Sequence, residues 1–356
     1  MSMIMERIHQ GKFVLIAEIG VNYYDIARKE HISNLEAAKL MVREARAAGI
    51  HGVKFQSYKA GTLAAKNSPA YWDMSEESTA SQYELFQKFD SFGEAEYREL
   101  AEYCKMQGIE FLSTAFDLES ADYLEHLMEI YKISSSDLNN YPFIEYQAKK
   151  GKPILLSTGA ADEAEIDRAL ASIRRYNQEL VILMHCVLEY PTPYCHANLN
   201  KITSLKRRYP DLVIGYSDHT KPDFHSDVIK TAYHLGAQVV EKHFTLDKTL
   251  PGNDHYHAMD PEDARQILSG IAFLKEIEGN CELKCLESER RARENARRSL
   301  ISLEKIEKGT RIEEQMLTWK RPGTGISPEE LEKLIGKEAK EDIPEDTILQ
   351  WGMFAG

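Results

Sequence analysis

The sequence lacks several features, and each absence excludes a class of protein. No apolar run approaches the roughly 18 residues of a membrane span. The N-terminus has no basic segment followed by an apolar one, so we expect neither a membrane protein nor a signal peptide. The five cysteines form no pattern typical of a disulfide framework or a zinc cage, which fits the reducing cytoplasm. The net charge of −13 argues against a nucleic-acid partner, which would usually bring a basic surface.

What the sequence does have is a regular alternation of short apolar runs and longer amphipathic segments. Eight apolar runs are predicted as buried strands, at residues 13–19, 52–55, 110–113, 130–133, 153–157, 181–185, 213–217 and 239–244. Helical patterns lie between them, among others at residues 34–48, 95–107, 162–173, 223–235 and 261–276. Eight strands, each followed by a crossover, favour a (β/α)8 TIM barrel of the α/β class over an open doubly wound sheet. No Gly-rich dinucleotide-binding turn follows the first strand, which also disfavours the open sheet.

The alternation stops near residue 280, where the composition becomes charged. We therefore predict a barrel domain over residues 1–280, a linker over 281–298 and a compact, loop-rich second domain over 299–356. The linker includes a basic stretch at 290–298, which we interpret as a solvated helix face or an interdomain contact.

Two histidines, His219 and His243, each follow a predicted strand, and a helical segment separates the two strands. Neighbouring parallel strands therefore present both imidazoles at the same end of the barrel. Imidazole nitrogens suit Mn, Fe, Co or Zn, and two of them with a carboxylate leave positions open for substrate or water. The matched placement favours a metal site over two unrelated polar residues.

All eight predicted strands carry polar residues at their C-terminal ends, where the active sites of TIM barrels form. In strand order these are Glu18, Lys54 with Gln56, Thr114, Lys132 with Ser135, Ser157, His185 with Tyr190, Ser217 with His219, and Glu241 with His243. Lys54 and Lys132 each lie within an apolar run, where an unpaired charge is costly. Lysines combined with hydroxyl groups suit phosphate and carboxylate oxygens.

Spacing alone leaves two aldolase-type chemistries open. A barrel lysine can form a Schiff base with a carbonyl substrate, whereas the paired histidines favour metal-assisted addition. Asp254, His255 and His257 follow the eighth strand, and alternation puts both of these histidines on one side of the loop. They either bind a metal themselves or belong to a loop that closes over the substrate. Prolines on both sides of Thr192 stiffen the loop that holds Tyr190 over the mouth.

Ordered motifs along the whole chain resemble those of the sialic acid synthase family, which condenses phosphoenolpyruvate with an N-acylated hexosamine to give a nonulosonic acid. The motifs are Ala17-Glu18-Ile19-Gly20, Val53-Lys54-Phe55-Gln56, Tyr131-Lys132-Ile133, Asn139-Asn140-Tyr141-Pro142, Gly151-Lys152-Pro153, Ser157-Thr158-Gly159, Tyr190-Pro191-Thr192-Pro193, Ser217-Asp218-His219-Thr220, His243-Phe244-Thr245 and Lys320-Arg321-Pro322-Gly323. The last motif resembles the family's small C-terminal antifreeze-like (SAF, β-clip) domain.

The resemblance implies a role for each matching residue. It implies that His219 and His243 hold a divalent metal, Mn or Mg. Phosphoenolpyruvate would be held by Lys54, Thr114, Lys132, Ser135, Ser157 and Ser217. The open-chain sugar would contact Gln56, Tyr190, Glu241 and Asp254, and Phe116 belongs to the predicted substrate-binding set. Arg321 would reach the acyl group of the sugar in the active site of the partner subunit, because the family forms domain-swapped homodimers.

In the implied reaction the metal polarises the sugar aldehyde, and the methylene carbon of phosphoenolpyruvate attacks it. Water then adds to the cationic C2, and phosphate leaves by C–O cleavage. We expect Glu18 to position or deprotonate that water, and we place Lys54, Lys132 and Asp137 in the catalytic set with it.

Three departures from the family pattern leave the identity of the sugar open. Tyr23 lies in an insertion that runs to His31, Asp137 replaces a glutamate, and Leu188 replaces an asparagine. N-acetylmannosamine and a diacetamido 6-deoxy hexose, which gives a legionaminic- or pseudaminic-type product, are both candidate acceptors.

Three rival interpretations remain. Condensation with a phosphorylated aldose would need a further Arg/Lys cluster, which we cannot identify in the sequence. A carbohydrate- or ice-binding protein on an inactive barrel would have no reason to bury Lys54, Lys132, His219 and His243. A metal hydrolase would turn over without phosphoenolpyruvate.

Overall fold

The computed structural model describes residues 2–72, 74, 77–252 and 254–355. The chain divides into two compact units, Met1–Glu278 and Gly279–Gly356. Among the described residues, no helix has both the length and the apolar character that crossing a membrane requires.

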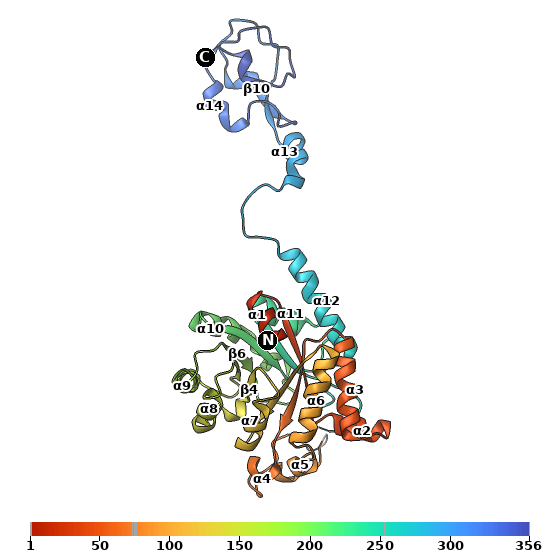
Figure 1. Ribbon diagram of the computed structural model, residues 1–356. Coiled ribbons are helices and arrows are strands. Elements are labelled where there is room, and N and C mark those ends of the chain that lie inside the picture. The colour runs from red at the N-terminus through yellow and green to blue at the C-terminus, as the bar shows by residue number, and fades with distance from the viewer. Residues whose placement is uncertain (1, 73, 75–76, 253, 356) are drawn as a thin grey trace. The chain divides into compact units, whose positions relative to one another are not determined.

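The first unit is a closed barrel of eight parallel strands in sequence order, with helices around it (Figure 1). The strands are β1 Val14–Gly20, β2 Gly52–Ser57, β3 Glu110–Ala115, β4 Tyr131–Ile133, β5 Ile154–Ser157, β6 Val181–Cys186, β7 Val213–Asp218 and β8 Val239–His243. The predicted TIM barrel is therefore confirmed.

Helices connect consecutive strands, and two of them begin at a well-formed cap. Ser33 and Asp162 are N-caps, and each forms a capping box with the glutamate three residues later. The helices of this unit are α1 Met3–His9, α2 Tyr23–Glu30, α3 Asn34–Ala47, α4 Ala60–Leu63, α5 Gln82–Lys88, α6 Glu94–Gln107, α7 Leu118–Leu124, α8 Tyr141–Ala148, α9 Glu163–Arg174, α10 Asn200–Arg208, α11 Asp227–His234 and α12 Pro261–Glu278.

The N-terminal end of the barrel is filled with apolar side chains. Ile4, Met5 and Ile8 of α1 pack with inward-facing strand residues such as Val14 and Leu112 in one buried cluster. The backbone amide of Ile4 also donates a hydrogen bond to the carboxylate of Glu110, at 2.8 Å. Because this end is packed solid, a ligand can enter only at the C-terminal ends of the strands.

The second unit has its own apolar core around Leu300, Ile306, Ile312, Ile343 and Leu349. Its regular elements are α13 Arg290–Ala296, β9 Ser299–Ser302, β10 Leu317–Lys320 and α14 Leu331–Leu334, and β9 pairs with β10 antiparallel. Isolated bridges such as Ile306–Ile343 tie the remaining loops together. This is the small, loop-rich domain that the sequence predicts.

Candidate active site

The strand register brings the predicted side chains to one level inside the barrel. Glu18 pairs with Lys54 of β2 and with His243 of β8, and Thr114 pairs with Lys132 of β4. The register shifts between Glu18 and Gly20, and Gly20 adopts a φ of 53°. Such a bulge re-aims the neighbouring side chains at the rim of a barrel.

An inner cavity of about 390 Å³ opens at this level. Its lining includes Glu18, Lys54, Gln56, Thr114, Phe116, Lys132, Ser135, Ser157, Tyr190, Ser217, His219, Glu241 and His243, so the structure brings together most of the predicted residues. Cys186 also lines it, whereas the predicted His185 does not. The imidazole of His185 instead contacts the carbonyl of Ala197 at 2.7 Å. The predicted strand begins where β6 begins but ends one residue early. Because neighbouring side chains of a strand lie on opposite faces, Cys186 and not His185 points into the cavity.

Two lysines and two carboxylates form a buried charge cluster on the floor of this cavity. Lys54 Nζ forms an ion pair with Glu18, lies 3.7 Å from Glu241 Oε1 and donates to Thr114 Oγ1 at 2.9 Å. Lys132 Nζ lies 3.6 Å from the same Glu241 oxygen. The two ammonium groups are thus held on either side of one carboxylate.

The pKa values of the cluster follow from burial and pairing. Burial lowers the pKa of Lys54, but Glu18 and Glu241 outweigh it, so the pKa lies above its ordinary value. Burial lowers the pKa of Lys132 by more than Glu241 raises it, so this pKa lies below its ordinary value. Burial raises the pKa of Glu18 to about 7, although Lys54 opposes the shift. Glu18 therefore changes its protonation state near neutral pH, as a general base should.

Several polar atoms around the cluster have hydrogen-bonding capacity left. Ser157 Oγ and Glu241 Oε2 are buried without a hydrogen-bond partner among the described residues. Ser135 Oγ accepts a hydrogen bond from the backbone amide of Gly159 at 2.8 Å, which places this hydroxyl beside Ser157 at the end of β5. Buried polar groups that lack partners are costly unless a ligand or water supplies them.

The two predicted metal-binding histidines are neighbours, with ring centroids 5.6 Å apart. His219 Nδ1 lies 2.9 Å from the carbonyl oxygen of Val187, which can only accept, so Nδ1 carries the proton and Nε2 is left with its lone pair. Burial, with His257 and His219 nearby, holds the pKa of His243 well below its ordinary value. His243 is therefore held in the neutral form that binds metals, whereas at His219 the nearby Cys186 outweighs burial and raises the pKa.

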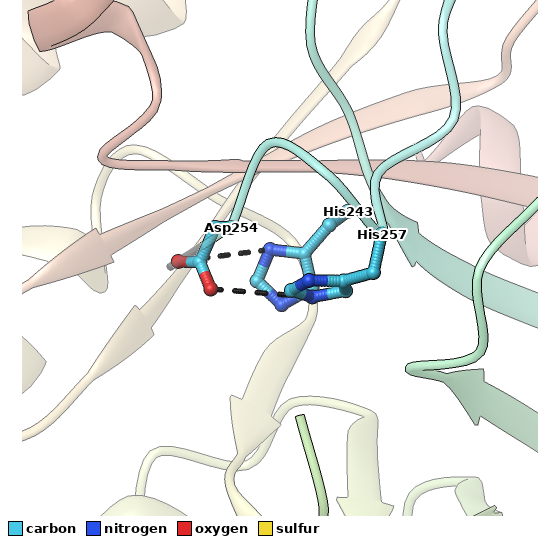
Figure 2. Close-up of side chains that lie close together, drawn as sticks. All are labelled: His243, Asp254 and His257. Atoms are coloured by element: carbon cyan, nitrogen blue, oxygen red, sulfur yellow. Dashed lines mark ion pairs between the residues drawn. The ribbon is translucent and has the colours of Figure 1, made fainter. Parts of the chain in front are cut away.

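Asp254 and His257 stand beside His243, in the loop that follows β8 (Figure 2). His243 Nδ1 lies 3.9 Å from Asp254 Oδ2, and His257 Nε2 lies 4.0 Å from Asp254 Oδ1. His255 faces elsewhere: its ring nitrogens contact Thr245 Oγ1 at 2.7 Å and Asp25 Oδ2 at 3.3 Å. The two histidines thus contact different groups, and residues 254–257 form a turn rather than the extended loop on which the predicted alternation depends.

A larger outer cavity of about 1400 Å³ adjoins the inner one and shares Gln56, Phe116, Leu188, Tyr190 and His243 with it. Much of its wall comes from the segment after β2 and is aromatic or apolar: Tyr58, Leu63, Tyr71, Trp72, Leu85, Phe86 and Phe89. Its polar lining includes Asn22, Asp25, Asp137 and Asp254. The sequence did not predict this wall. The clustered aromatic residues between 58 and 92 were the only feature of the sequence that indicated it.

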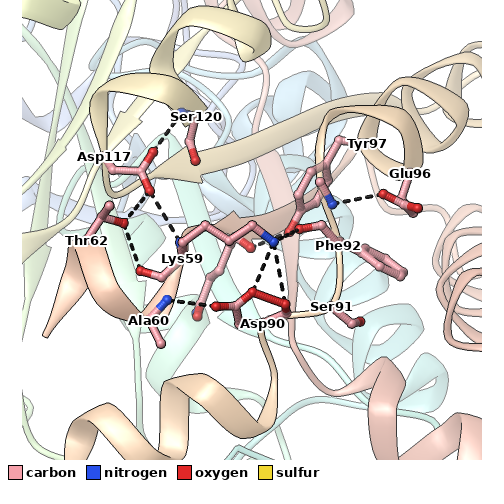
Figure 3. A network of polar contacts seen from close by, with 12 residues as sticks. Lys59, Ala60, Thr62, Asp90, Ser91, Phe92, Glu96, Tyr97, Asp117 and Ser120 are labelled. Carbon is pink, nitrogen blue, oxygen red and sulfur yellow. Dashed lines mark hydrogen bonds and ion pairs between the residues drawn. The ribbon is translucent and has the colours of Figure 1, made fainter. Parts of the chain in front are cut away.

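A network of polar contacts anchors that segment to the barrel (Figure 3). Lys59 Nζ reaches Asp90 Oδ1 at 3.0 Å and the carbonyl of Phe92 at 2.9 Å. Asp117, the N-cap of α7, accepts from Thr62 Oγ1 at 2.6 Å and from the amide of Ser120 at 2.7 Å. The Lys59 contacts thus join the two ends of the aromatic wall to each other, and the Thr62 contact fastens its first end to the start of α7.

The three departures noted in the sequence lie in different places. Tyr23 is 1% exposed and stacks on Phe92 with ring centroids 4.5 Å apart, so it belongs to the core. Asp137 and Leu188 line the outer cavity. Asn140 donates to Asp137 Oδ1 at 3.3 Å, and burial raises the pKa of Asp137. Arg321 belongs to the second unit, where it is exposed directly after β10.

Comparison with known proteins gives a consistent result for the whole chain. Residues 41–282 match the NeuB family, and residues 297–355 match the SAF domain. The N,N'-diacetyllegionaminic acid synthase of Campylobacter jejuni is 37% identical over 345 residues, which cover 95% of this chain and 99% of that protein. The N-acetylneuraminate-9-phosphate synthase of Drosophila melanogaster is 30% identical over 377 residues, which cover 97% of each chain.

A solved structure agrees with these relatives. The N-acetylneuraminic acid synthetase of Leptospira borgpetersenii, in complex with citrate, superposes with a TM-score of 0.68 at 30% identity, covering 79% of this chain and 90% of that one. The family match spans more than half of the sequence and includes strands β2 to β8 of the barrel. The chain therefore belongs to the NeuB family of nonulosonic acid synthases and carries a C-terminal SAF domain.

Proposed function

We propose that this protein condenses phosphoenolpyruvate with an open-chain N-acylhexosamine and water to give a sialic-type nonulosonic acid and phosphate. One observation carries the proposal: two buried lysines and the hydroxyls of Thr114 and Ser157 line one small cavity beside a pair of imidazoles. Ammonium and hydroxyl donors complement the phosphate and carboxylate of phosphoenolpyruvate. A net charge of −13 makes such local capture necessary.

The residues of the inner cavity have different roles in the proposed reaction. Lys54 and Lys132 bind the anionic groups of phosphoenolpyruvate and hold its methylene carbon toward the outer cavity. A divalent metal, Mn or Mg, held by His219 and His243 would supply Lewis-acid polarisation of the sugar aldehyde. Glu18 accepts a proton from the water that adds to C2, and the tetrahedral carbon then expels phosphate with C–O cleavage. Carbon–carbon bond formation thus precedes phosphate release.

The outer cavity accommodates the sugar in this proposal. N-acetylmannosamine is the simplest acceptor, with Gln56, Tyr190, Glu241 and Asp254 as its contacts. Leu188 and the aromatic wall favour a second candidate, a diacetamido 6-deoxy hexose, because its methyl and extra acetyl groups bury apolar surface. Among the described residues that line this cavity there is no Lys or Arg, which disfavours a phosphorylated acceptor.

The proposal includes the domain-swapped homodimer in which Arg321 completes the site of the partner subunit. Sedimentation velocity tests the dimer. Mixing an Arg321→Ala chain with a Lys132→Met chain tests the swap, since heterodimers regain one complete site only if Arg321 acts in the partner.

The decisive assay is phosphate release from phosphoenolpyruvate with Mn²⁺, offering each of the two acceptors, N-acetylmannosamine 6-phosphate and no sugar. Release that requires a sugar and stops with a chelator supports the proposal and identifies the acceptor. Bridging ¹⁸O in phosphoenolpyruvate appears in the phosphate if the C–O bond breaks. Release without sugar points to a hydrolase, and no release from folded, metal-loaded protein contradicts the proposal.

A further inference from the structure

Two histidines of the loop after β8 differ in what surrounds them. His255 is 1% exposed, and both of its ring nitrogens contact protein oxygens. His257 is fully buried and instead lies against His243, with ring centroids 4.9 Å apart, and against Asp254. The loop therefore turns the imidazole of His257 toward His243 and Asp254, whereas that of His255 lies in the wall of the outer cavity.

We infer that His257 is a metal ligand, and that His243, Asp254 and His257 form a two-histidine, one-carboxylate metal site. The inference refines the metal centre of the proposed function, for which His219 and His243 were the expected ligands. His219 remains close, with its ring centroid 6.4 Å from that of His257, and can add a further nitrogen from the cavity side.

The distances among these three side chains suit a bound metal ion. One ligand atom from each of the three side chains lies within 4.8 Å of the others. The two imidazole–carboxylate separations, 3.9 and 4.0 Å, are too long for hydrogen bonds. They are within the ~4.2 Å that two ligand atoms can span across an ion with bonds of ~2.1 Å. The spacing suits an ion between the groups better than direct contact between them.

The kinds of ligand atom that these three side chains offer also suit a metal ion. Two imidazoles and one carboxylate on one side of an ion leave its other positions open, which is the arrangement of metal centres that also bind substrate. His243 Nδ1 is buried and makes no hydrogen bond to any described residue, so it has a lone pair or proton to use. Asp254 lines the outer cavity, so an ion held there would face the proposed sugar.

Metal binding to the full-length protein tests the inference without phosphoenolpyruvate or sugar, so its failure is separable from failure of the proposed function. Chelator-stripped protein is titrated with Mn²⁺, and free Mn²⁺ is followed by electron paramagnetic resonance. We expect His257→Gln to weaken Mn²⁺ binding by at least about 100-fold, above the 10–100-fold typical of groups that only support a ligand. The visible spectrum of the Co²⁺-loaded protein should also change, because a nitrogen ligand is lost.

His255→Gln is the matched control, since it removes a buried imidazole from the same loop without touching the cluster. Equal loss of Mn²⁺ affinity in both variants would overturn the inference, as would an unchanged affinity and Co²⁺ spectrum in His257→Gln. If His257→Gln fails to fold, His257→Asp keeps a ligating atom and provides the same test. Binding of Mn²⁺ within tenfold of wild type, with a shifted Co²⁺ spectrum, supports ligation, and an unshifted spectrum refutes it.

Discussion

The barrel buries two sets of lysines and carboxylates, one on each side of its strands. On the outer side, Lys242 Nζ reaches Asp218 Oδ2 at 2.6 Å and the carbonyl of Thr220 at 2.5 Å. The other oxygen of Asp218 accepts from Tyr216 Oη at 2.8 Å and from the amide of Thr220 at 2.9 Å. On the inner side, Lys132 lies 3.6 Å from Glu241, whose second oxygen has no hydrogen-bond partner among the described residues.

The two sets are equally buried, so burial does not distinguish them: Lys242 is 2% exposed and Lys132 is 4% exposed. The completeness of their hydrogen bonding distinguishes the two sets. A closed network stabilises the fold and has no capacity for a ligand, whereas an open one retains donors and acceptors that a substrate can use. The comparison indicates that buried charges identify a site only where their partners are incomplete.

Breaking the Lys242–Asp218 pair should have the largest of the expected effects. That effect should be on the stability of the fold. Lys242→Met leaves Asp218 charged and unpaired in the interior, so we expect the free energy of unfolding to fall by about 3–5 kcal/mol. Urea denaturation measures this change. Replacing Asp218 by Asn in the same chain should recover part of the loss, and a loss in Lys242→Met below about 1 kcal/mol would contradict the structural role.

The same substitution on the inner side should act on catalysis instead. Lys132→Met removes a phosphate or carboxylate contact, so we expect kcat/KM for phosphoenolpyruvate to fall by about 10²–10³-fold. The free energy of unfolding should fall by less than in Lys242→Met, because the nearest carboxylate oxygen is 3.6 Å from Lys132 and the cost of burying the lysine charge is removed with it. A stability loss as large as that of Lys242→Met would remove the distinction between the two sets.

A partly buried group, His51 before β2, extends the comparison to pH. Burial, with Arg7 nearby, lowers the pKa of His51 to about 4, and its Nδ1 accepts from the amide of Leu15 at 2.9 Å. A lowered pKa means that the folded state favours neutral His51. Its contribution to the free energy of unfolding, about 3 kcal/mol, is complete above pH ~6.5 and is lost as the pH falls toward 4. Urea titrations at pH 7, 5.5 and 4.5 measure this, and His51→Gln should flatten the dependence.

The pH dependence of catalysis should give the smallest effect, about tenfold per pH unit. Because burial raises the pKa of Glu18 to about 7, the carboxylate that accepts a proton exists mainly above that pH. We expect kcat/KM to rise from pH 5.5 and to level off above pH 7.5. Glu18→Gln should abolish this rise of kcat/KM with pH. Wild-type turnover in that variant with metal bound would refute the role of Glu18.

Most of the barrel and the inner cavity could be predicted from the sequence. The eight predicted strands match the observed ones to within two residues, because strands buried on both faces are continuous apolar runs. Lys54, Lys132, His219 and His243 were found because each follows or interrupts such a run. His185 was placed on the wrong face, since the predicted strand ended one residue before Cys186 and neighbouring side chains of a strand lie on opposite faces.

The outer cavity could not be predicted in this way. Its wall comes from the irregular segment that holds Tyr58, Trp72 and Phe86, which has no period to interpret. The aromatic residues of that segment predict burial but not the surface against which they pack. Tyr23 shows the same limit: the sequence indicated a substrate-side departure, and the structure places it in the core.

By itself, the sequence determined the fold class, the end of the barrel that holds the site and the charged residues on its floor. These follow from periodicity and from the geometry of parallel strands, which are properties of short segments. Only the tertiary structure decided that His257 rather than His255 lies against His243 and Asp254, and that the Lys242 network is closed while the Lys132 network is open. The direction of a loop side chain and the completeness of a hydrogen-bond network depend on groups far apart in the chain, and folding alone brings these together.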